Sequence, residues 1–334
     1  MAHIRFESAL FTLVIFSLQV SPTGLLSQSQ SLARESSILA RELASTSPKA
    51  SGGSHLASFR VSSDLVLVPV TVTDRLNRPQ TDLRPEDFIV YEGQKAQKIQ
   101  YFSSEDSPIS VGLLVDASQS MTNKIDTERA AVAEFFKNAN PEDDYFVVTF
   151  NYGPRVLSDV TRSTSGIETE LGLVKPSGST ALLDAIYLGV DKLQHAQYSR
   201  RALVIISDGG DNSSHYKLRE VKNLVAESDV MVYAIGIFDS GPFKSFEEKM
   251  GKLWLSSITD VSGGRTITVT NADQLPEAGA QISRELRSQY VLGYHPAEKA
   301  VSARWRKIKV AVPRSSEAGP LRPYYKKGYY ASEP

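Results

Sequence analysis

The sequence predicts an α/β protein whose doubly wound, mostly parallel sheet is inserted in a small β domain. Three observations predict this fold class. Between residues 109 and 288, short apolar runs alternate with segments of helical spacing. These runs are nearly continuous, as expected for strands buried on both faces of a parallel sheet. The flanking segments 59–106 and 289–334 have only strand and turn patterns, so we expect them to pair with each other.

Each element of the α/β region follows from its own pattern. Only residues 151–154 link the strands 145–150 and 155–158, which is too short for a crossover. We therefore expect strand 155–158 to run antiparallel at the edge of the sheet. The other predicted strands are 111–115, 202–207, 230–237 and 265–270, and the predicted helices lie near 121–138, 166–174, 181–194, 216–227, 245–257 and 273–288.

The first flanking segment begins with "LVLVPVTVTD", a run rich in β-branched residues. Its valines alternate, which predicts one buried face made of Val66, Val68, Val70 and Val72. Pro69 within this run favours an edge strand, because proline cannot donate to a sheet ladder. Two further short strands are expected around the turn at Glu92 and Gly93.

Composition narrows the class of protein. The chain has 334 residues, of which 41% are hydrophobic and 22% charged, which is ordinary for a globular protein. The formal net charge of −1 gives no reason to expect a nucleic acid or a membrane surface held by bulk charge. There is no cysteine, which excludes disulfides, thiolate zinc sites and a cysteine nucleophile.

The first residues predict export. A weakly basic start with Arg5 and Glu7 precedes an apolar run from Ala9 to Val20, which is short for a bilayer span and typical of a signal peptide. We expect a signal peptide over residues 1–27, a Ser/Ala-rich linker over 28–58, and a periplasmic or secreted product without a stable membrane span. An uncleaved N-terminal anchor is the alternative.

Three loops carry oxygen donors at the ends of predicted strands. They are "DASQS", "KPSGST" and "SDGGDNSS". Ligands of open α/β sheets bind at the carboxyl ends of the strands, where the strand order reverses. The donors there are hard oxygens, which suit Mg²⁺ first and Mn²⁺ or Ca²⁺ as alternatives, rather than zinc or copper. The predicted metal ligands are Asp116, Ser118, Ser120, Thr180 and Asp208.

The small number of charges in this donor set indicates its chemistry. Two carboxylates and three neutral hydroxyls leave a divalent cation under-neutralised. Such an ion accepts an outside anionic oxygen, and the Asp or Glu carboxylate of a protein partner fits that description. The donor set therefore predicts a protein-binding module that is not an enzyme.

These motifs resemble a known family. The Asp-x-Ser-x-Ser of "DASQS", the threonine of "GST" and the aspartate of "SDG" are similar to the metal-ion-dependent adhesion site (MIDAS) of von Willebrand factor type A (VWA) domains. The resemblance covers residues 109–288 and implies a Rossmann-like fold. It also implies that Ser118, Ser120 and Thr180 bind the ion through hydroxyls, and that Asp116 and Asp208 act directly or through water.

The flanks narrow the resemblance. "VPVTVTDRLNRPQTDLRPEDFIVYEGQKAQKIQYF" before the domain and "YVLGYHP", "KIKVAV" and "KKGYY" after it resemble bacterial exported proteins with a VWA-related domain, common in acidobacteria. One hairpin departs from the pattern of that group, because "YEGQKAQ" offers only Glu92 before its turn glycine.

Other interpretations stay open at this point. Ser118 and Ser120 could cap the helix expected from Met121, and Asp208 could belong to a plain turn. A metal-dependent esterase or phosphatase would need a base, for which only His215 is nearby in sequence. A structural envelope protein with a vestigial site is the third possibility. Asp184 is expected to be exposed or in a capping turn, and Asp211 to be a loop residue.

Overall fold

The structure is a computed structural model that describes residues 65–238, 246–297, 305–317 and 319–331. The predicted signal peptide (1–27) and linker (28–58) lie outside the described residues. In the described part of the chain, no helix combines the length and the apolar character that crossing a membrane requires. The exact domain boundaries given above stay predictions.

The α/β region contains the predicted sheet. Its strands run parallel except for the last, β7, which is antiparallel to β6 at the edge, as expected. The first strand of this sheet in the sequence is the central strand β5, and β6 and β7 follow on one side of it. The next strands, β8, β9 and β10, follow on the other side of β5, so the strand order reverses at β5. The strands in spatial order are β10 (Thr266–Val269), β9 (Met231–Ile237), β8 (Arg201–Ser207), β5 (Ser110–Asp116), β6 (Asp144–Phe150) and β7 (Pro154–Thr161).

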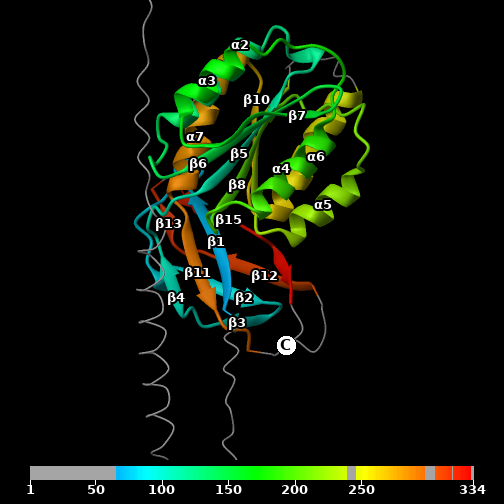
Figure 1. Ribbon diagram of the computed structural model, residues 1–334. Helices are drawn as coiled ribbons and strands as arrows, with labels where there is room; N and C mark the ends of the chain where they lie inside the picture. Colours follow the sequence, from blue (N-terminus) through cyan, green and yellow to red (C-terminus); the bar gives the residue numbers. More distant parts are fainter. Residues whose placement is uncertain (1–64, 239–245, 298–304, 318, 332–334) are drawn as a thin grey trace, which may run out of the picture. The chain divides into compact units, whose positions relative to one another are not determined.

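Helices cover both faces of this sheet (Figure 1). One apolar cluster joins one face of the sheet to α2 (Ile125–Phe136), α3 (Thr164–Gly172) and α7 (Leu275–Arg287). A second cluster joins the other face to α4 (Leu182–Gln194), α5 (Leu218–Glu227) and α6 (Phe246–Ser262). Every residue of β5, β6 and β9 is buried, which explains the nearly continuous apolar runs of the sequence. The fold class is therefore confirmed as α/β with a mostly parallel sheet.

The two flanking segments form further antiparallel sheets together, also as predicted. Each of these sheets combines strands from before and after the α/β region. One contains β15 (Arg322–Tyr325), β1 (Val66–Thr73), β11 (Tyr290–Tyr294) and β4 (Tyr101–Ser103), and the other β16 (Gly328–Tyr330), β12 (Trp305–Ala311), β2 (Ile89–Glu92) and β3 (Lys95–Gln97). A shared core that includes Val68, Val70 and Val72 joins the two sheets. Short pieces complete the fold: β13 (Ser315–Ser316), β14 (Gly319–Pro320) and the 3₁₀ turns Pro85–Asp87, Gln119–Met121 and Ala272–Gln274.

The prediction of an edge strand from Pro69 was wrong. β1 has β11 on one side and β15 on the other. Pro69 is opposite Val291 of β11, but the pairing with β15 begins only at Val70. The proline therefore lies beyond the end of the second neighbour, where its missing N–H leaves no gap in a ladder on that side.

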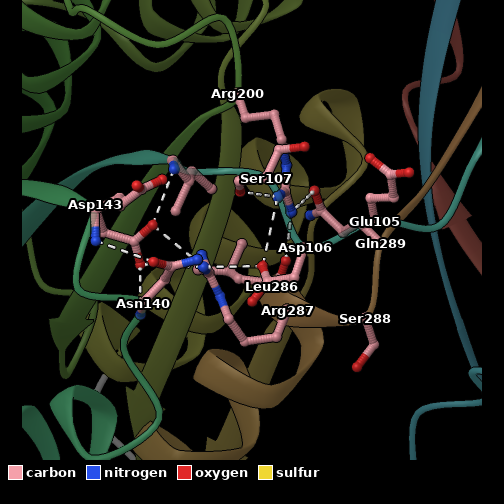
Figure 2. Close-up of polar contacts among 12 residues, drawn as sticks. Glu105, Asp106, Ser107, Asn140, Asp143, Arg200, Leu286, Arg287, Ser288 and Gln289 are labelled. Atoms are coloured by element: carbon pink, nitrogen blue, oxygen red, sulfur yellow. Dashed lines mark hydrogen bonds and ion pairs between the residues drawn. The ribbon is translucent and has the colours of Figure 1, made fainter.

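Two arginines hold together the connections into and out of the α/β region (Figure 2). Arg200, just before β8, donates to the carbonyl of Ser107 ahead of β5 and to that of Leu286 in α7. Arg287, the last residue of α7, forms ion pairs with Asp106 at 3.0 Å and with Asp143 at 3.1 Å. The start of β5 is thus fixed to the end of α7, and β5 then leads directly to the candidate site.

Candidate metal site

Asp116 is the last residue of β5, and its side chain is fully buried. Its Oδ1 accepts the Ser118 N–H at 3.0 Å. This bond from the backbone two residues later forms an Asx-turn, which aspartate side chains favour. Its Oδ2 accepts the hydroxyl of Ser207, the last residue of β8, at 2.6 Å. One carboxylate oxygen is therefore oriented by the loop that follows β5, and the other by the end of the neighbouring strand β8.

The two serines of "DASQS" lie side by side. Their Oγ atoms are 3.0 Å apart, with Ser118 buried and Ser120 exposed. Helix α2 begins at Ile125 rather than near Met121, and no side-chain cap bond is formed by Ser118 ahead of the 3₁₀ turn or by Lys124 ahead of α2. The interpretation of these serines as helix caps is therefore wrong, because the helix starts too late for them.

The second loop is bound directly to the first. The Gln119 N–H donates to the carbonyl of Gly178 at 3.0 Å, and the Ser177 N–H donates to the carbonyl of Ala117 at 2.8 Å. Gly178 has a φ of +80°, a conformation that glycine adopts without strain. These bonds hold the second loop, which contains the buried Thr180 just ahead of α4, against the first loop.

The third loop joins the other two through Asn212. The Thr180 N–H donates to Asn212 Oδ1 at 2.8 Å, and the Asn212 N–H returns a bond to the Thr180 carbonyl at 2.9 Å. A Cβ atom placed on Gly210 would lie 3.4 Å from Asp208 Oδ1 and 4.0 Å from Thr180 Oγ1. Asp208 and Thr180 therefore border the same small space, and Asp208 is half-buried there. The structure brings all the predicted site residues to one edge of the sheet.

The electrostatics of this edge fit a cation. Burial and the nearby charge of Asp208 raise the pKa of Asp116 to about 6, although hydrogen bonds from Ser118 and Ser207 act in the opposite direction. Neither Asp116 nor Asp208 belongs to any ion pair among the described residues. No group of three or more His, Cys, Asp or Glu side chains is arranged for metal binding in the described ranges, so an ion here would depend on the hydroxyls.

Glu128 is a functional candidate that the sequence reasoning missed. It is fully buried on α2, and its Oε1 accepts the Asp116 N–H at 3.2 Å. Its Oε2 is buried without a hydrogen-bond partner. Burial, and then the charge of Asp116, raise the pKa of Glu128 well above the usual range. The available signal was its position on the apolar face of α2, four residues before Val132 and seven before Phe135.

Asp184 is buried in the first turn of α4, so of the two expectations for it, exposure was wrong and a position in the first turn of the helix was right. Its Oδ1 accepts the N–H groups of His215 at 2.8 Å and of Tyr216 at 3.0 Å, and its Oδ2 pairs with His215 Nδ1 at 2.8 Å. Asp211 is a loop residue, as expected, and its Oδ1 accepts the Leu183 N–H at 3.3 Å. The two aspartates thus fasten the loop 208–217 to the first turn of α4.

The sheet order and the three joined loops define a VWA-type domain. Residues 111–210 match the family model described as von Willebrand factor type A domain, and the chain therefore contains a domain of this family. Such domains often depend on a metal ion and mediate protein interactions. The narrower resemblance to acidobacterial exported proteins stays a prediction.

Individual relatives are distant. An uncharacterized protein of Borreliella burgdorferi is 23% identical over 160 residues, covering 45% of this chain and 47% of its own length. The chain thus spans about half the length of the curated relative that it matches. A von Willebrand factor type A structure from Catenulispora acidiphila is 15% identical with a TM-score of 0.48, covering 82% of this chain and 65% of that one.

Two further solved structures are similar to parts of the chain. BatB from Bacteroides thetaiotaomicron is 16% identical with a TM-score of 0.44, over 54% of this chain and all of that one. Proximal thread matrix protein 1 from the mussel byssus, described with a zinc-occupied MIDAS motif, is 16% identical with a TM-score of 0.47, over 59% of this chain and 50% of that one.

Proposed function

We propose that this protein is an exported, non-enzymatic binding module. A divalent cation held by Asp116, Ser118, Ser120, Thr180 and Asp208 engages an Asp or Glu carboxylate of a partner protein. The observation that carries the proposal is the convergence of three hydrogen-bonded loops on two carboxylates without a cationic partner in the described part of the chain. The family, whose members often mediate protein interactions, supports the same function.

Each residue has a distinct part in this proposal. Ser207 and the Ser118 N–H orient the Asp116 carboxylate, and Asp208 supplies the second negative charge. The hydroxyls of Ser118, Ser120 and Thr180 add neutral oxygen donors. When bound, a divalent cation supplies positive charge and an open position for a carboxylate. Mg²⁺ is the first candidate, with Mn²⁺ and Ca²⁺ as alternatives, and Zn²⁺ is included in the test for comparison.

A metal-dependent hydrolase is the second candidate, and one observation favours it. His215 Nδ1 is held by Asp184 at 2.8 Å while its side chain stays 90% exposed, as a general base would require. Turnover of generic esters or phosphoesters that needs both the metal and His215 would support this candidate over the first. The third candidate, a structural envelope protein with a vestigial site, requires that no metal binds.

Calorimetry with Mg²⁺, Mn²⁺, Ca²⁺ and Zn²⁺ tests the site. We expect the Asp116→Ala variant to lose at least about tenfold in affinity for the preferred ion, the smallest effect typical of removing a group that orients metal ligands. Asp229→Ala is the matched control. Asp229 is an exposed aspartate just ahead of β9, at the end of the parallel strands opposite to the candidate site, and it forms an ion pair with Lys326. Equal metal affinity of Asp116→Ala and Asp229→Ala would refute the proposed site.

A further inference from the structure

We propose that the sheet edge around the candidate metal site docks an acidic segment of a partner protein. One carboxylate of the segment would occupy the site, and further carboxylates would meet a rim of basic side chains, Arg155, Lys175 and Lys217. This inference rests on the proposed function and goes beyond it, because it assigns several acidic residues to the partner and a place to each.

The charge on this edge is one-sided. Four segments border the site: 117–124, 151–155, 173–180 and 208–217. Within them, every exposed Asp, Glu, Lys, Arg or His side chain is basic or a histidine, and the two aspartates, Asp208 and Asp211, are half-buried. Since the whole chain has a formal net charge of −1, this concentration of basic groups is local to the edge. Acidic partners are complementary to it.

The basic rim is available for a partner. Among the ion pairs of the described residues, none includes Arg155, Lys175 or Lys217. All three belong to the segments that border the site. Arg155 is opposite Thr149, which precedes Phe150, and the Phe150 carbonyl accepts the Ala117 N–H. Lys175 lies two residues before Ser177, whose N–H donates to the Ala117 carbonyl. Lys217 ends the loop that begins at Asp208.

Next to the rim, two exposed side chains are already held in place. His215 is 90% exposed at its side chain and bonded to Asp184. Tyr216 is 38% exposed, and its ring stacks on Tyr187 with centroids 3.9 Å apart and planes 2° from parallel. Both supporting residues lie on α4. Exposed groups ordered in advance lose little conformational entropy when a partner binds, which is a property of effective contact residues.

A third exposed aromatic side chain lies by the second loop. Tyr152 is 70% exposed, and its ring packs so closely on Gly178 that a Cβ there would be 2.3 Å from Tyr152 Cε2. Tyr152 and Tyr216 come from different loops, 151–155 and 208–217, that both border the site. Such flat, amphipathic surfaces contact the backbone of a bound segment whatever its charge, so they fit a polypeptide better than a free anion.

Fluorescence anisotropy with short capped peptides tests the proposal on the full chain. The probes are Gly/Ser peptides with no glutamate, with one central glutamate, or with one central glutamate and several flanking ones. In Mg²⁺ we expect the acid-rich peptide to bind roughly tenfold more tightly than the single-acid peptide, since each exposed ion pair contributes modestly. EDTA should abolish the binding of both.

Charge reversal separates the rim from bulk charge. The Lys175→Glu/Lys217→Glu variant should lose the preference for the acid-rich peptide but keep its binding of the single-acid peptide in Mg²⁺. Lys98→Glu/Lys307→Glu is the control and should keep the preference, because it makes the same net charge change on two exposed lysines, one just after β3 and one in β12. The control variant therefore separates the local rim from a general effect of charge.

Three results would overturn the inference. Equal binding of the single-acid and acid-rich peptides would do so while leaving the proposed function intact. Equal loss of preference in the two charge-reversed variants would show that bulk charge is the cause. Binding of an acid-rich peptide and of a DNA oligonucleotide alike in EDTA would indicate an unspecific polyanion surface. If no peptide binds in Mg²⁺, the proposed function itself fails.

Discussion

At the scale of single residues, the candidate site buries carboxylates, although removing their negative charge from water costs free energy. Asp116 is fully buried, has Asp208 nearby, and lies against Glu128, whose Oε2 has no hydrogen-bond partner. Buried carboxylates without a cation stay protonated to a higher pH than exposed ones. Without metal, this corner should therefore weaken the fold as pH rises.

The stability of the metal-free protein tests this at Asp116. Its pKa is raised from 3.8 to about 6, so the folded state binds this proton more tightly than the unfolded state. The stabilisation is complete below pH 3.8 and is lost as pH rises through about 6. In EDTA, we expect this group to lower the free energy of unfolding by about 3 kcal/mol across that window. Urea denaturation at a series of pH values measures it.

The Asp116→Asn variant separates the effect of Asp116 on stability from that of the other carboxylates. Asp159, for example, has its pKa lowered mainly by its hydrogen bond to Lys192, so its contribution to the pH dependence of stability has the opposite sign. The difference in unfolding free energy between wild type and variant should fall with rising pH in EDTA. With saturating Mg²⁺ the fall should disappear, because the ion compensates the charge. A difference that stays constant with pH in EDTA would contradict the assignment of a raised pKa to Asp116.

At the scale of elements, the contact between α2 and α7 supports the site from behind. A Cβ atom on Gly279 of α7 would lie 2.2 Å from the carbonyl oxygen of Ala131 on α2. Only glycine allows the two helices to approach this closely. Since α2 also carries Glu128, which accepts the Asp116 N–H, the position of this helix determines the position of the strand end.

Gly279→Ala should therefore destabilise the protein, although alanine is the better helix former. Overpacking typically costs about 1–3 kcal/mol, which exceeds the gain in helix propensity of about 1 kcal/mol. Gly172→Ala at the end of α3 is the control, because a Cβ there meets no atom within 4 Å. Thermal unfolding should show a lower Tm for Gly279→Ala only. Equal Tm values for the two variants would mean that the helices can separate without cost.

At the scale of the whole molecule, side-chain contacts join the α/β region to the flanking sheets between which it is inserted. Arg265 and Glu285 form a buried ion pair with an Nε–Oε2 distance of 3.0 Å, and Arg265 also donates to Asn77 Oδ1 at 2.8 Å. Asn77 lies in the turn after β1, so one guanidinium connects the α/β region to the flanking sheets. The same guanidinium lies 5.0 Å from the centre of the Tyr324 ring of β15.

Arg265→Met should cost about 3–5 kcal/mol of stability, because it leaves the Glu285 carboxylate buried without its partner. The double variant Arg265→Met/Glu285→Leu should recover most of this loss, since a well-packed apolar pair often replaces a buried ion pair at little cost. Chemical denaturation of both variants measures the two values. A double variant as unstable as the single one would show that the bonds to Asn77 and Tyr324, rather than the charge of Glu285, dominate.

The sequence by itself determined the architecture and the set of candidate ligands. Apolar runs specify strands wherever both faces are buried, and polar residues that follow such runs must gather at one edge of a parallel sheet. For this reason the sheet, its antiparallel edge strand, the pairing of the flanks and the closeness of Asp116, Ser118, Ser120, Thr180 and Asp208 could all be predicted. The metal itself stays a proposal.

Only the tertiary structure decided which polar groups are buried and which neighbours hold them. Glu128 and Asp184 are acidic residues on helices, and sequence spacing alone does not show that one lies under a strand end and the other under a loop. Pro69 lies within a paired strand because β15 ends one residue short of it. These outcomes depend on contacts between segments far apart in the chain, and local sequence patterns carry no record of such contacts.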